Sequence, residues 1–72
     1  MNYDTTYKGF RITVRPNIDG AVISLFRIKP PSPSSLLSYS VSKTEIEKMK
    51  NEGKDVIVEK IKLMKTDIDL NV

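Results

Sequence analysis

Four basic residues in the front half of the chain are the side chains whose type and spacing could do chemistry. They fall along two strands predicted between residues 10 and 29: Arg11, Arg15, Arg27 and Lys29. Guanidinium groups form bidentate contacts with phosphate, and a two-stranded ribbon can enter the major groove of DNA. This basic face therefore predicts nucleic-acid binding as one candidate function. The solvated face of a half-covered antiparallel sheet is the alternative interpretation.

The charge of the 72-residue chain is unevenly distributed. The net charge is +3, and all of the positive excess lies in residues 1–42, because lysines and carboxylates are equal in number in residues 43–72. Phe10 and Phe26 are expected on the buried side of the sheet, which leaves the basic face without an aromatic platform for base stacking. We therefore expect only a modest electrostatic footprint on nucleic acid.

Catalytic or metal chemistry has few candidate residues in this chain. The sequence contains no histidine and no cysteine, which removes imidazole bases, thiolate nucleophiles and the usual ligands of zinc and haem. The three glycines are scattered and form no phosphate-binding loop, and Asp67 and Asp69 share only a strand-like spacing. We therefore expect a protein that is not an enzyme and has no cofactor, no metal and no small-molecule substrate.

A β-hairpin is needed to position the basic face. Apolar and polar residues alternate on both sides of Asp19-Gly20, which predicts two strands joined by a turn. A register that pairs Phe10 with Ile28 keeps apolar residues together and leaves a three-residue turn that ends at Gly20. In this register an arginine of one strand lies opposite an arginine of the other, and an acid or a ligand is needed to offset the repulsion.

The middle of the chain predicts a connector, a third strand and the start of a helix. Residues 30–35 are rich in proline and serine and form a stiff connector, because proline lacks an amide donor. Residues 36–41 alternate between apolar residues and serine, which predicts a strand. Ser42 lies three residues before Glu45, a spacing typical of a helix N-cap, so we expect a helix from Lys43.

The last part of the chain is ambiguous between helix and strand. Residues 55–65 contain a run of β-branched residues, but their apolar residues recur at helical spacing, and we expect a helix with Asp55 as its N-cap. Residues 67–72 alternate acid or amide with aliphatic side chains. We expect an extended or frayed tail there.

Together these elements predict one α+β domain spanning residues 1–72. A three-stranded antiparallel sheet, made of an N-terminal hairpin and a third strand, has one face covered by one or two C-terminal helices. No segment approaches the roughly 20 apolar residues that span a bilayer, and the first residues lack the pattern of a secretory signal. We expect a soluble, cytoplasmic protein without a membrane partner.

Three aliphatic residues fall outside the predicted core: Ile23, Leu25 and Leu36. The first two are expected on the same face as the arginines, and surfaces that mix arginine with aliphatic residues are typical of protein interfaces. We therefore expect a small module that binds a protein partner, including a second copy of itself, and acts as a regulator or accessory subunit. Nucleic-acid binding through the basic face is the alternative.

Overall fold

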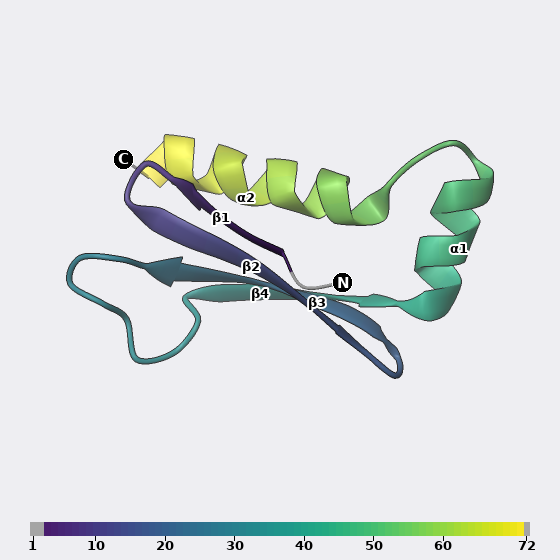
Figure 1. Cartoon of the computed structure of the whole chain (residues 1–72). Helices are drawn as coiled ribbons and strands as arrows, with labels where there is room; N and C mark the ends of the chain where they lie inside the picture. Colours follow the sequence, from purple (N-terminus) through teal and green to yellow (C-terminus); the bar gives the residue numbers. More distant parts are fainter. Residues whose placement is uncertain (1–2, 72) are drawn as a thin grey trace.

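A computed structural model describes residues 3–71 as a four-stranded antiparallel sheet followed by two helices (Figure 1). The strands lie in chain order in the sheet, so each pairs with the next along the chain. Helix α2 covers one face of the sheet, and α1 lies at one end of it (Figure 1). The elements are β1 (Tyr3–Tyr7), β2 (Phe10–Asn17), β3 (Gly20–Arg27), β4 (Leu37–Ser42), α1 (Lys43–Asn51) and α2 (Val56–Asn71).

The α+β class, the antiparallel sheet and the two C-terminal helices are confirmed, but the predicted number of strands is wrong. The additional strand is β1, which pairs with β2 through a two-residue turn at Lys8 and Gly9. Their φ angles of 48° and 84° are both positive, as in the type I′ turns that suit hairpins. β1 is an edge strand without aliphatic residues, so it lacks the hydrophobic alternation by which strands are recognised in a sequence.

The predicted register of the central hairpin is wrong by one residue. Phe10 lies opposite Arg27, and the turn contains only Ile18 and Asp19. The side chain of Asn17 helps to close this short turn, because its Oδ1 accepts a hydrogen bond of 2.9 Å from the amide of Asp19. A shift of one residue moves every side chain of a strand to the opposite face, so the predicted faces of β3 are exchanged.

The core lies between the helices and the covered face of the sheet. Ile12 of β2, Ile23 of β3 and Met64 of α2 are completely buried and lie at its centre. Apolar residues of α2 recur at the spacing of an amphipathic helix, which turns one stripe of the helix toward the sheet. The other members of the core cluster are Val14, Ala21, Leu25, Val41, Val56 and Ile68.

Both predicted N-caps are confirmed. The hydroxyl oxygen of Ser42 accepts a hydrogen bond of 3.1 Å from the amide of Glu45 at the start of α1. In the same way, Oδ1 of Asp55 accepts from the amides of Ile57 and Val58, at 3.0 and 3.3 Å. Such caps satisfy amides of the first helical turn that have no partner within the helix.

The C-terminal segment differs from its prediction. Residues 67–71 continue α2 instead of forming an extended or frayed tail, and Val72 lies outside the described residues. Ile68 is buried one turn after Met64, so the apolar stripe of the helix runs on into this segment. The connector at residues 30–35 contains neither helix nor strand.

Gly20 is the glycine on which the fold depends most. Its φ is 148°, and a Cβ added to it would overlap the backbone carbonyl oxygen of Val41. We predict that Gly20→Ala lowers the free energy of unfolding by about 2–4 kcal/mol, from overpacking together with an unfavourable φ. Urea denaturation followed by circular dichroism measures this loss.

Gly53→Ala is the matched control for this change. Gly53 also has a positive φ, 76°, but a Cβ added there meets no atom within 4 Å. We expect Gly53→Ala to lower the free energy of unfolding by about 1 kcal/mol, from backbone strain alone. Equal losses for the two variants would show that the close approach of Gly20 to β4 is unimportant.

Candidate interaction surfaces

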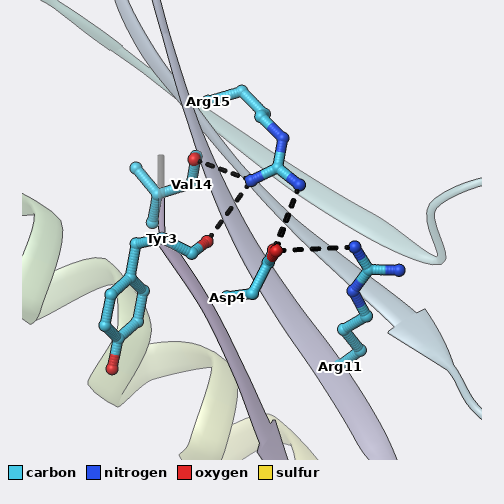
Figure 2. Close-up of polar contacts among 5 residues, drawn as sticks. All are labelled: Tyr3, Asp4, Arg11, Val14 and Arg15. Atoms are coloured by element: carbon cyan, nitrogen blue, oxygen red, sulfur yellow. Dashed lines mark hydrogen bonds and ion pairs between the residues drawn. The ribbon is translucent and has the colours of Figure 1, made fainter. Parts of the chain in front are cut away.

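The uncovered face of the sheet carries a small network of charges around Asp4. β1 brings this carboxylate next to two arginines of β2 (Figure 2). Nη2 of Arg15 lies 3.1 Å from Oδ1 of Asp4, and Nη2 of Arg11 lies 3.6 Å from Oδ2. Nη1 of Arg15 also donates to the carbonyl oxygens of Val14 and Tyr3, at 3.1 and 3.4 Å. Asp4 offsets the repulsion between Arg11 and Arg15, whereas the predicted pair of opposed arginines, Arg11 and Arg27, does not form.

The four residues of the predicted basic face do not form one surface. Arg11 and Arg15 lie together, but the corrected register places Arg27 on the opposite parity, across from Phe10. Nε of Arg27 donates to the carbonyl oxygen of Pro30 at 3.0 Å, and Lys29 lies after the end of β3, in the loop that leads to β4. The ion pairs to Asp4 are about half exposed, so each stabilises the fold by roughly 0–1 kcal/mol.

The three aliphatic residues proposed as an interface have different positions. Ile23 and Leu25 lie on the covered face within the core, which corrects their predicted position beside the arginines. Leu36 is 49% exposed and borders a hollow of about 390 Å³ with Phe10 and Ile68. The one-residue shift explains the difference, because it brings Val22 and Phe26 to the uncovered face instead.

A larger groove, which the sequence did not predict, lies between the two helices and the end of the sheet. It has a volume of about 500 Å³, within the range of ~300–1,000 Å³ of ligand-sized clefts. Its apolar wall comes from four parts of the chain: Tyr3 of β1, Val14, Pro16 and Ala21 of the β2–β3 hairpin, Ile46 of α1, and Ile57, Val58 and Ile61 of α2. No local pattern marks such a groove, since it forms only when these segments pack.

Two of the three charged side chains at the groove already have partners. Asp55 caps α2, and Nζ of Lys65 lies 5.4 Å from the centre of the Tyr7 ring, a cation–π distance. Lys62 is exposed and adds a second positive charge to the same wall. The groove is therefore an apolar surface with lysines along one side, and it suits an apolar side chain with a carboxylate nearby.

The C-terminal half of α2 is tied to both edges of the sheet by tyrosines and aspartates. The hydroxyl of Tyr7 in β1 donates to the carboxylate of Asp69 at 3.0 Å, and Nζ of Lys8 lies 2.6 Å from the same group. The hydroxyl of Tyr39 in β4 donates to Oδ2 of Asp67 at 3.2 Å. These contacts fix how α2 crosses the sheet.

The same contacts shift three pKa values. The hydrogen bonds from Lys8 and Tyr7 lower the pKa of Asp69, and the hydrogen bond to Asp69 raises the pKa of Lys8. Burial, together with the negative charge of Asp67, raises the pKa of Tyr39. Each shift comes from packing and charge where α2 meets an edge strand, and none of the three groups lines the groove.

Comparisons of the chain with protein-family models, with curated proteins and with solved structures found no match. Within the part of the chain that the structure describes, no cluster of three or more carboxylates is placed to hold a metal ion. Neither α1 nor α2, the helices of that part, is long and apolar enough to cross a bilayer.

The lowered pKa of Asp69 predicts a dependence of stability on pH. The stabilising contribution of this carboxylate is fully present above its ordinary pKa of 3.8 and is lost as the pH falls through the lower pKa of the folded state. We expect Asp69→Asn to reduce the drop in melting temperature between pH 5 and about pH 2, the range over which a paired carboxylate is protonated.

Thermal denaturation followed by circular dichroism at several pH values measures this effect. Glu47→Gln, which removes an exposed carboxylate from α1, is the control and should leave the acid-induced drop nearly unchanged. The explanation is wrong if the melting temperatures of the Asp69→Asn variant and of the wild-type protein fall by the same amount on acidification.

Proposed function

We propose that the chain is a small, non-catalytic module that binds protein, including a second copy of itself, as a regulator or accessory subunit. The observation that carries this proposal is the apolar groove between α1, α2 and the sheet. Val58, on the wall of the groove, is 43% exposed although it is aliphatic. Burial of such a side chain by a partner contributes about 25 cal/mol for each Å² of apolar surface that is removed from water.

The chemical character of the groove supports a macromolecular partner over a small substrate. Interface centres are poor in charge and rich in aromatic and aliphatic residues, with polar groups at the rim. Tyr3, Ile46 and Val58 provide such a centre, and Lys62 provides a charged rim. A catalytic site needs convergent polar groups with unusual protonation, whereas Asp55 at this groove serves as a helix cap. A cytoplasmic location is part of the same proposal.

Nucleic-acid binding through the uncovered face is the second candidate. The corrected register favours it in one respect, because Phe26 lies directly opposite Arg11 on that face. Basic residues interleaved with an aromatic ring are typical of surfaces that bind single strands. Asp4 opposes this function, since its carboxylate holds the arginines that phosphates would have to engage.

Two substitutions in α2 test the role of the groove. Val58→Glu places a carboxylate in its wall, whereas Leu63→Glu changes a residue of similar exposure, 47%, that does not line the groove. We predict that Val58→Glu weakens self-association by about tenfold or more, equivalent to ~1.4 kcal/mol, and that Leu63→Glu leaves it nearly unchanged. Sedimentation equilibrium measures the dissociation constants, and circular dichroism verifies the fold. Equal effects of both substitutions would contradict an interface at the groove.

Asp4→Asn separates the two candidate functions. Loss of this carboxylate releases Arg11 and Arg15 for phosphate, so this variant is the form of the protein best suited to bind nucleic acid. We expect neither it nor the wild type to change in sedimentation when single-stranded or duplex DNA is added at low salt, and we expect its self-association to match the wild type. Salt-sensitive binding of single strands, stronger in the variant, would support the nucleic-acid function instead.

A further inference from the structure

Ile18 is the most exposed large hydrophobic residue among those that the structure describes, with 92% of its surface accessible. It forms, with Asp19, the turn between β2 and β3. Turn positions of this kind favour glycine, asparagine, aspartate and serine. An isoleucine there contributes nothing to the core of its own chain, although it presents an aliphatic side chain at the tip of a hairpin.

The turn that carries Ile18 is held in place by hydrogen bonds on both sides of Asp19. The amide of Asp19 donates to Oδ1 of Asn17 at 2.9 Å, and its carbonyl oxygen accepts from the amide of Lys43 at 2.8 Å. The second bond ties the tip of the hairpin to the start of α1. Because the tip is held before any partner arrives, less conformational entropy is lost when Ile18 is buried at an interface.

The groove lies next to the tip of the same hairpin. Pro16 and Gly20, each two residues from Ile18, belong to its lining. The β2–β3 turn projects at the end of the sheet where α1 lies (Figure 1). An exposed aliphatic side chain and an apolar recess therefore lie next to each other at one end of the molecule. A two-fold axis through such a surface brings each side chain to the recess of the other copy and gives a closed dimer.

We propose that two copies of this chain associate by inserting Ile18 of each into the groove of the other. This inference rests on the proposed function and names the occupant of the groove. The charges fit: Ile18 is followed by the exposed Asp19, and the wall of the groove carries Lys62 and Lys65. Its one carboxylate, Asp55, accepts hydrogen bonds as the cap of α2. Asp19 of one copy is then brought toward the lysines of its partner, an arrangement that favours the correct orientation.

Two single substitutions and their mixture test this exchange. Ile18→Lys replaces the inserted side chain with a charge that the lysines of the wall repel, and it leaves the groove intact. Val58→Glu alters the groove but leaves Ile18 intact. Each variant alone is expected to self-associate at least about tenfold more weakly than the wild type. An equimolar mixture is expected to form a mixed dimer more tightly than either variant self-associates. In one of its two exchanges Ile18 meets an unaltered groove, and in the other the introduced lysine meets the introduced carboxylate.

Sedimentation of the separate and mixed proteins, with one variant carrying a fluorescent label, measures these associations, and thermal denaturation verifies that both variants fold. If Val58→Glu weakens the dimer and Ile18→Lys does not, the groove has another occupant, so this inference fails while the proposed function stands. Weakening by both substitutions without recovery in the mixture also overturns the reciprocal exchange. A dimer that resists both substitutions assembles elsewhere and overturns the inference. A wild-type protein that stays monomeric overturns both proposals.

Discussion

The structure depends on the position of α2 across one face of the sheet. An antiparallel sheet with one apolar face needs a second layer to cover it, and Met64 of α2 meets that need at the centre of the core, with Ile12 and Ile23. The tyrosines of the two edge strands then fix the helix in place, Tyr7 through Asp69 and Tyr39 through Asp67. The contact of Tyr7 is exposed and that of Tyr39 is part-buried, and the net contribution of a single hydrogen bond to stability is modest. These contacts select one orientation for a helix that apolar burial already holds against the sheet.

The groove is a consequence of how little the first helix can cover. α1 has nine residues, and no side chain of this helix is fully buried, although Ile46 and Met49 pack against the core cluster. It begins directly after β4 and is tied to the β2–β3 turn through the amide of Lys43. At the start of α2, Val56 is buried in the core, but Val58 is left 43% exposed because the sheet and α1 do not cover it. A chain of this length buries only about 60% of the surface exposed when unfolded.

The sequence predicted the elements whose ends are marked by capping residues and did not predict those without such marks. Ser42 and Asp55 marked both helix starts correctly, because a cap is a property of a few neighbouring residues. The register of the hairpin could not be predicted in the same way. β3 carries apolar residues on both parities, so Phe26 and Leu25 were equally suitable for the core until α2 selected one face. β1 escaped detection because an edge strand needs only paired backbone and little buried surface.

This single register shift also decides which surfaces are available to partners. It places Ile23 and Leu25 beneath α2, so these two residues are not part of an exposed protein interface. It also places Arg27 on the face opposite to Arg11 and Arg15, so the predicted basic face is not continuous. Exposed apolar surface lies instead at the end of the sheet near α1, where Ile18 extends from the turn and Val58 remains open in the groove. A small domain cannot bury all of its aliphatic side chains in one thin core. Where those left outside include both a projecting side chain and a recess, a second copy of the chain offers each of them a complementary surface.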